Sequence, residues 1–186
     1  MSAFVVEEFV EACVDAVSTE DTPHMAIKDI VERAVSDPAA VEATMGDLTE
    51  LPSFVPLHNS DTLTILHIVW PPGVDLYAHD HNMWATIGLY GGREDNTFYR
   101  RLETGMIEDR GTKEMLRGDV VVLGDDTVHA VKNPSSEWTG AFHVYGGDFF
   151  RTPRTMWDME TLQPAPYDHS QAEAVLSNAR EAALSL

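Results

Sequence analysis

The chain has 186 residues, of which 44% are hydrophobic, so it is long enough for one domain with a sizeable core and short for two. Its 31 acidic and 12 basic residues give a formal net charge of -19. This charge repels phosphate backbones and anionic bilayers. We therefore expect no nucleic-acid partner and no membrane partner, and we expect a small molecule as the ligand.

Cysteine content and hydropathy favour a cytoplasmic protein. Cys13 is the only cysteine, which excludes an intramolecular disulfide and agrees with a reducing compartment. No run approaches 18 apolar residues, and the opening segment MSAFVVEEFVEA is acidic where a secretory signal is basic.

Helices are predicted in the first part of the chain. Residues 3–19 repeat apolar side chains at spacings of three and four, which is typical of an amphipathic helix. Residues 25–37 predict a second helix, and a short third helix follows the break at Pro38. We interpret residues 1–50 as a helical extension packed on the rest of the domain.

From residue 51 to about residue 150 the pattern changes to short alternating or β-branched runs separated by turn residues, as in an antiparallel sandwich or barrel. Strands are predicted at 62–70, 83–91, 96–103, 118–124, 127–133 and 139–147. The stretch GREDN at 92–96 is interpreted as part of a hairpin turn. Within the C-terminal part, 151–186, residues 159–168 look irregular, and a closing helix is predicted with its cap near Ser170.

Two histidines one residue apart are the first candidate site. His79 and His81 would face the same side of an extended strand and could bind one metal ion together. Gly73 precedes them, with five residues between it and His79. Farther along, GDVVVLGDDTVHAVKN places Gly118, His129 and Asn133 around a turn between two predicted strands.

These two segments resemble the two sequence motifs of the cupins, which are small jelly-roll barrels with a double-stranded β-helix. The resemblance implies a mainly β fold and a metal site of His79, His81 and His129. It also implies a glutamate near position 85 or 86, where this chain has Ala85 and Thr86. The site would then consist of three histidines and no carboxylate. Gly124 and Asp126 replace the proline and second glycine of the second motif.

A cupin with three histidine ligands resembles the thiol dioxygenases, the group that includes cysteine dioxygenase. Those enzymes have a Ser-x-His-x-Tyr relay outside the metal ligands, and His143 and Tyr145 match it, with Ala141 in place of the serine. Alternation along a strand puts these three side chains on one face. The resemblance covers about residues 50 to 150.

Two features of cysteine dioxygenases are missing. Cys13 is too far away to form the crosslink to tyrosine that the animal enzymes have. The arginine that binds the substrate carboxylate in those enzymes lies upstream of the His-x-His pair, and no arginine stands between Leu51 and His79. The remaining candidates for this role are His58, Arg93, Arg100 and Arg101.

The resemblance implies a mononuclear Fe(II) enzyme that oxidises a small thiol to a sulfinate with O2. Three neutral imidazoles leave a ferrous ion its full charge and a vacant face, which favours an anionic ligand such as a thiolate. Tyr145, held by His143, would orient the bound substrate or oxygen.

Several alternatives stay open at this point. Zinc, nickel or manganese could occupy the same ligands, and a zinc site could activate water for hydrolysis or hydration. A three-histidine dioxygenase could cleave a carbon-carbon bond of a diketone, or the barrel could bind a metal or small molecule without catalysis. A homodimer is also open. We interpret Trp70, Trp84, Phe142 and Tyr77 as core or pocket wall, and assign no role to His24, His67 and His169.

Overall fold

Within residues 3–185, which the computed structural model describes, three helices precede the strands and one follows them. They are α1 (Val6–Thr19), α2 (Pro23–Val35), α3 (Pro38–Met45) and α4 (His169–Leu184). Prolines in the first turns of α2 and α3 suit positions where a backbone N–H has no helical partner. The predicted N-terminal helices and closing helix are confirmed, with Asp168 rather than Ser170 as the cap of α4. None of these helices combines the length and apolar character needed to span a bilayer.

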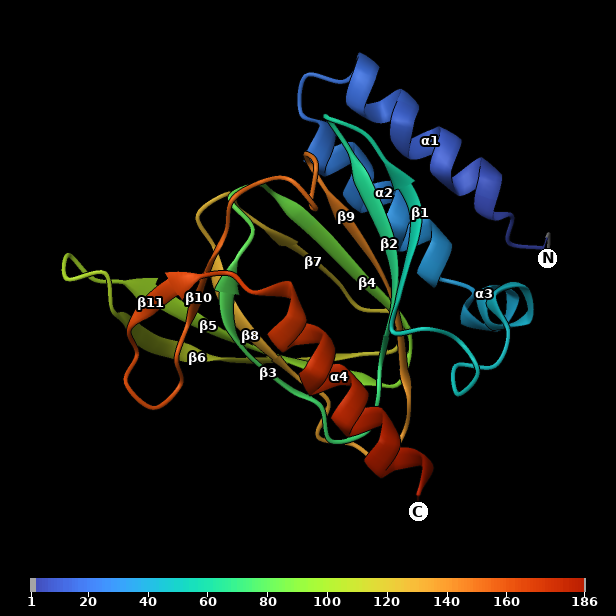
Figure 1. Ribbon diagram of the computed structural model, residues 1–186. Coiled ribbons are helices and arrows are strands. Elements are labelled where there is room, and N and C mark those ends of the chain that lie inside the picture. Colours follow the sequence, from blue (N-terminus) through green and yellow to red (C-terminus); the bar gives the residue numbers. More distant parts are fainter. Residues whose placement is uncertain (1–2, 186) are drawn as a thin grey trace.

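The strands form two antiparallel sheets that face each other (Figure 1). The five-stranded sheet has the order β1-β2-β9-β4-β7, and the six-stranded sheet has the order β11-β10-β3-β8-β5-β6. The strands are β1 (Phe54–Asn59), β2 (Thr64–Trp70), β3 (Asp75–Asp80), β4 (Ala85–Gly91), β5 (Arg93–Arg101), β6 (Ile107–Leu116), β7 (Val120–Leu123), β8 (Val128–Lys132), β9 (Thr139–Tyr145), β10 (Thr155–Trp157) and β11 (Pro164–Pro166).

The pairing from β2 to β9 is that of a jelly roll. Strands β5 and β6 form a hairpin, and the strands on either side of it pair in turn: β4 with β7, β3 with β8 and β2 with β9. One long hairpin is thus rolled up so that its successive segments lie in both sheets, which defines a double-stranded β-helix. The fold class predicted from the sequence is confirmed.

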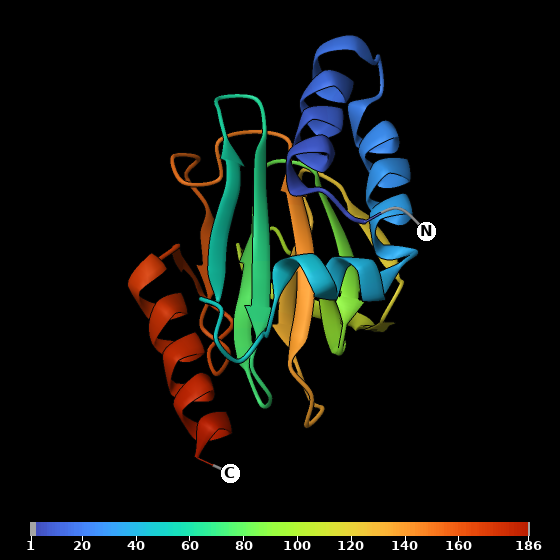
Figure 2. The same cartoon turned by 90° about the vertical axis from the view of Figure 1, so that its right-hand side faces the viewer.

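Each face of the five-stranded sheet contacts a different apolar layer. Along β2, Leu66, Ile68 and Trp70 point into the barrel, and Ile65 points outward to the helices. Figures 1 and 2 show α1, α2 and α3 gathered on this outer face, apart from α4. Gly88 on β4 permits the close packing of α2, because a Cβ atom there would lie 2.3 Å from Cγ1 of Val31.

The predicted strands omit β1, β3, β6, β10 and β11. Strand β6 is an edge strand whose residues are nearly all exposed, so its sequence IEDRGTKEML carries no alternation of apolar and polar residues. Strands β10 and β11 have only three residues each, and β11 begins and ends with proline. The stretch 92–96 is also not a turn, because β5 begins at Arg93.

Candidate metal centre

The structure brings His79, His81 and His129 together inside the barrel. One ligand atom from each of the three side chains lies within 4.8 Å of the others, and all three residues are buried. His79 is on β3 directly opposite His129 on β8, and His81 follows the end of β3. Two separate sequence motifs thus converge because β3 and β8 are neighbours in one sheet.

The hydrogen bonds of two of these rings leave Nε2 for a metal. The Nδ1–H of His79 donates to the carbonyl oxygen of Tyr77 at 3.0 Å, and that of His129 donates to Oδ1 of Asn96 at 2.7 Å. Among residues 3–185, the buried Nε2 of His129 finds no hydrogen-bond partner. An unpaired buried nitrogen facing two other imidazoles fits a metal ligand.

Burial also keeps the three rings neutral, which is the form that binds a metal. It lowers the pKa of His79 to about 4, and it lowers the pKa of His81 and His129 well below the usual value, with the other histidines of the group adding to the shift of His81. The residues present therefore fit a divalent ion with three neutral nitrogen ligands and no protein carboxylate among them.

His143 and Tyr145 lie beside this group on β9. The sequence prediction that they share a face with Ala141 is confirmed, because Ala141 and Tyr145 belong to the core inside the barrel and the Tyr145 hydroxyl lies 3.1 Å from Nδ1 of His143. The ring of Tyr145 packs 4.9 Å from that of His81, centroid to centroid. Burial raises the pKa of the Tyr145 phenol, so it stays protonated.

A buried carboxylate that sequence reasoning missed lies behind these residues. Glu94 on β5 has no exposed surface. Its Oε2 accepts from Nε1–H of Trp70 at 2.6 Å, and its Oε1 accepts from Nδ2–H of Asn96 at 2.8 Å. The same Oε2 lies 3.6 Å from Nε2 of His143. Asn96 opens the predicted strand at 96–103, but Glu94, two positions earlier on the same face of β5, falls in the predicted turn and was therefore missed.

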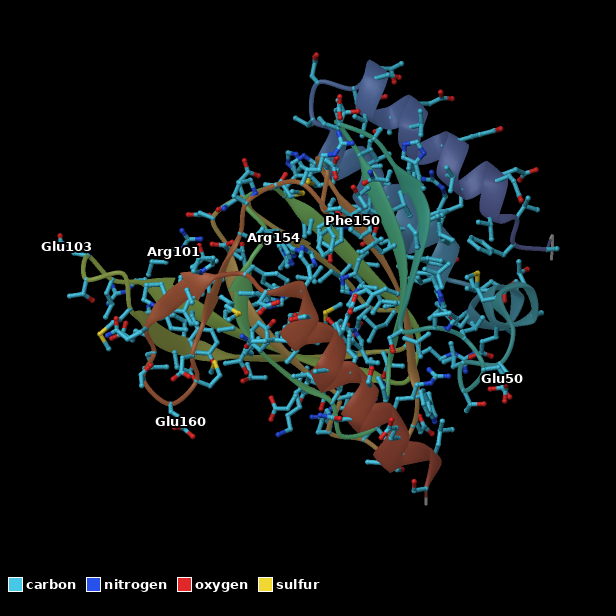
Figure 3. The ribbon with its side chains drawn as sticks, in the orientation of Figure 1. Glu50, Arg101, Glu103, Phe150, Arg154 and Glu160 are labelled. Atoms are coloured by element: carbon cyan, nitrogen blue, oxygen red, sulfur yellow. The ribbon has the colours of Figure 1, made fainter. Side chains whose placement is uncertain are left out.

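A buried arginine is the second residue that the sequence analysis missed. Arg154 is 6% exposed, and its guanidinium lies between the rings of Phe149 and Tyr167, 3.9 and 4.1 Å from their centroids. Its Nη2 is 3.3 Å from Nε2 of His169, beside the first turn of α4 (Figure 3). Among the described residues, its Nε and Nη1 have no hydrogen-bond partner. An unpaired buried cation is costly, so a bound anion would stabilise it.

Residues of the His-x-His segment hold Arg154 in place. Asn82, which follows His81 in the left-handed conformation with φ 53°, donates from Nδ2 to the carbonyl oxygen of Pro153 at 2.8 Å. Asp80 accepts a hydrogen bond from the backbone N–H of Thr155 at 2.8 Å. Both neighbours of Arg154 are therefore fixed by the segment that provides two of the three histidines.

The four cations proposed from the sequence lie elsewhere or are already paired. Arg93 binds Asp95 and Glu114, and Arg100 binds Glu108. Arg101 pairs with Asp80, and His58 lines a surface pocket beside α1. Of the four, only Arg101 approaches the histidines, because its partner Asp80 stands between His79 and His81 in the sequence.

Apolar and aromatic side chains close the site. A cavity of about 20 Å³ lies among the three histidines, His143 and Tyr145, and its wall includes Trp70, Phe149 and Tyr167. This is room for about one water molecule, so a larger ligand has to displace wall side chains such as Phe149 or Tyr167. A groove of about 650 Å³ between α1, α2 and α3 lies on the outer side of the five-stranded sheet, away from the histidines.

The predicted aromatic wall residues divide between the two layers. Trp70 lines the cavity, and Tyr77 packs against the same core. Phe142 and Trp84 belong to the layer under the helices. Trp84 lies beside the metal motif in sequence, but it packs over Gly146, where a Cβ atom would lie 2.1 Å from the indole.

Fold and site together define a jelly-roll barrel with a buried three-histidine centre. No family model matches the chain. Solved structures with a similar fold include an RmlC-like cupin protein from Methanocaldococcus jannaschii, 20% identical, with a TM-score of 0.44 over 55% of this chain and 87% of that one. The Cnp3 cupin domain of Schizosaccharomyces pombe is 13% identical, with a TM-score of 0.45 over 56% and 69%.

An oxalate decarboxylase of Bacillus subtilis with Mn(II) centres is also similar, at 17% identity and a TM-score of 0.40 over 48% of this chain and 22% of that one.

Proposed function

We propose that the protein is a mononuclear Fe(II) dioxygenase that oxidises a small thiol bearing a carboxylate to the sulfinate. The observation that carries this proposal is the combination of three neutral histidines and a protonated tyrosine at one enclosed cavity, with an unpaired buried arginine stacked between two aromatic residues of the cavity wall. In the balanced reaction, both atoms of O2 pass to sulfur. Two S–O bonds form, the O–O bond breaks, and the thiol proton is released.

His79, His81 and His129 would hold the ferrous ion, which supplies coordination of the thiolate and activation of O2 on the face that the protein leaves open. The absence of a protein carboxylate among the ligands favours an anionic substrate atom. The closed apolar wall excludes water from the reacting atoms. The small cavity favours a substrate of few heavy atoms.

Tyr145 would position the reacting groups. Its hydroxyl is held by His143, and its ring packs against that of His81. Because burial raises the pKa of Tyr145, the phenol keeps its proton and serves as a hydrogen-bonding group. A fixed hydroxyl at this place orients a bound thiol or oxygen without itself changing charge.

Arg154 would bind the substrate carboxylate. The guanidinium presents unpaired N–H groups, and its positive charge adds to the effect of burial in lowering the pKa of His79 and His81. Arginine pairs with carboxylates through two parallel hydrogen bonds, which fixes orientation as well as charge. We therefore expect a mercaptocarboxylate or cysteine to be preferred over a thiol amine.

The test is oxygen uptake by protein purified without metal and reloaded anaerobically with ferrous ion. The substrates are 3-mercaptopropionate, cysteine, cysteamine and a β-diketone, and zinc-loaded protein is the blank. Uptake with a carboxylate-bearing thiol, matched by sulfinate, supports the proposal. Uptake with the diketone alone indicates carbon-carbon cleavage, and no uptake with any substrate contradicts the dioxygenase.

A further inference from the structure

One carboxylate connects the metal ligands with the tyrosine. Glu94 hydrogen-bonds Asn96, which hydrogen-bonds the ligand His129, and it lies beside His143, which hydrogen-bonds Tyr145. Asn96 and His129 form one arm of this network, and His143 and Tyr145 form the other. Both arms are buried, and both begin at the carboxylate oxygens of Glu94. Strand β5, which carries Glu94 and Asn96, pairs with the strand of His129.

The orientation of Asn96 depends on this carboxylate. Both oxygens of Glu94 accept hydrogen bonds, one from Trp70 and one from Asn96. Asn96 therefore turns its NH2 group to Glu94, and its Oδ1 faces Nδ1 of His129. An acceptor there requires the proton of His129 on Nδ1 and frees Nε2 for a metal.

The same reasoning applies to His143. A carboxylate oxygen 3.6 Å from Nε2 favours a proton on that nitrogen, because a lone pair facing the carboxylate would be repelled. Nδ1 of His143 then accepts the hydrogen bond from the Tyr145 hydroxyl at 3.1 Å. Trp70 donates to Glu94 and cannot reverse its role, since indole has only an N–H.

We propose that Glu94 is a positioning residue that determines which ring nitrogen carries the proton in the histidine of each arm. As a result, His129 presents Nε2 to the metal and His143 orients the hydroxyl of Tyr145. This inference rests on the metal site of the proposed dioxygenase, but it concerns proton positions and requires no turnover. Glu94 acts through Asn96 and His143 rather than by touching the metal or substrate.

Glu94→Gln is the first test, because the side chain keeps its shape and exchanges one acceptor for a donor. The new NH2 group cannot face Trp70, so it faces Asn96, which must flip and present its own NH2 to His129. Nδ1 of His129 then becomes the acceptor, and Nε2 carries the proton. We expect the affinity of the full-length chain for Zn²⁺, measured by competition with a chromophoric chelator, to fall about 10- to 100-fold.

Glu94→Gln combined with Asn96→Asp is the matched rescue. The carboxylate moves from position 94 to position 96, where it can accept from the new amide at position 94 and from Nδ1–H of His129 together. We expect most of the lost Zn²⁺ affinity to return. Wild-type affinity in the single variant, or no recovery in the double variant, would overturn the proposal for the His129 arm.

A second measurement uses the unaltered protein, in case a variant fails to fold. Nitrogen-15 correlation spectra of the histidine side chains in the metal-free chain report which nitrogen carries each proton. The proposal requires Nδ1–H in His129 and Nε2–H in His143, and the opposite tautomer in either ring contradicts it. Neither measurement uses a thiol or O2, so a failure of the dioxygenase proposal is distinguishable from a failure of this one.

Discussion

Asp80 accepts a hydrogen bond from the backbone N–H of Thr155, and this contact ties the segment between His79 and His81 to the segment that carries Arg154. Asn82 makes the matching contact on the other side, to Pro153. The proposed metal ligands and the proposed carboxylate-binding cation are therefore placed by one short stretch of chain. For the proposed substrate, this connection would set the separation between thiol and carboxylate.

Asn82→Gly tests the connection. Glycine tolerates the positive φ of this position, so the variant removes only the side-chain hydrogen bond to Pro153. We expect a several-fold rise in KM for a carboxylate-bearing thiol and little change in kcat, because Arg154 loses part of its support. Equal KM values for the variant and the wild type, with Zn²⁺ affinity unchanged, would show that the contact does not matter.

Arg154→Gln should raise KM for 3-mercaptopropionate about 10- to 100-fold, the loss expected for hydrogen bonds to a charged group. Oxidation of cysteamine, which has no carboxylate, should change little. Arg100→Gln is the control, since Arg100 pairs with Glu108 on the surface. A similar loss for both thiols would indicate that Arg154 supports the fold of the site and not the carboxylate.

Tyr145→Phe should lower kcat about 10- to 100-fold while the Zn²⁺ affinity remains that of the wild type, because the hydroxyl positions the reacting groups and is no metal ligand. Steady-state oxygen uptake and metal competition measure the two effects separately. Unchanged kcat would remove Tyr145 from the proposed mechanism.

His67 predicts a loss of stability in acid. It is fully buried against Tyr90, and burial lowers its pKa to about 4, with the charge of His143 as a smaller cause. In the unfolded chain His67 takes up a proton near pH 6.5. Its contribution to the free energy of unfolding is therefore present above that pH and is lost as the pH falls towards 4. The slope attributable to this group is at most about 1.4 kcal/mol per pH unit.

Urea unfolding of the wild type and of His67→Gln at several pH values between 4 and 7 measures this contribution. The variant keeps a hydrogen-bonding group towards Tyr90 but cannot take up the proton. We expect the unfolding free energy of the variant to depend less steeply on pH. Parallel pH dependences would show that His67 is not responsible.

Gly88→Ala should destabilise the protein by about 1–3 kcal/mol, because the added methyl group overpacks the contact between β4 and α2. Adding Val31→Ala removes the atom nearest to the added methyl group. Val31→Ala should therefore lower the unfolding free energy less in the Gly88→Ala variant than in the wild type. Additive losses in the double variant would place the strain elsewhere.

The fold class and the three histidines could be predicted because they depend on local patterns. Alternation marks the inner strands, and the spacing from Gly73 to His81 and from Gly118 to Asn133 marks the turns that deliver the ligands. Asn133 has a structural role at its motif position. Its Nδ2 donates to the carbonyl oxygens of Trp70 and Glu137, and these two hydrogen bonds join two loops.

Glu94 and Arg154 could not be predicted in the same way. The local sequence around Glu94 is typical of a turn, and only its pairing with β6 and β8 makes it a strand with a buried carboxylate. Arg154 comes from the segment before the short strand β10, and its burial against two residues of the cavity wall depends on Phe149, Tyr167 and α4. Both residues owe their surroundings to contacts that are distant in sequence.

The origin of the oxygen atoms in the product tests most directly whether this barrel is a thiol dioxygenase. Iron-loaded protein is given 3-mercaptopropionate under oxygen-18 gas in ordinary water, and the sulfinate is analysed by mass spectrometry. We predict that both sulfinate oxygens carry the label. A product that takes one or both oxygens from water, or no sulfinate at all, would contradict the assignment of this barrel as a thiol dioxygenase.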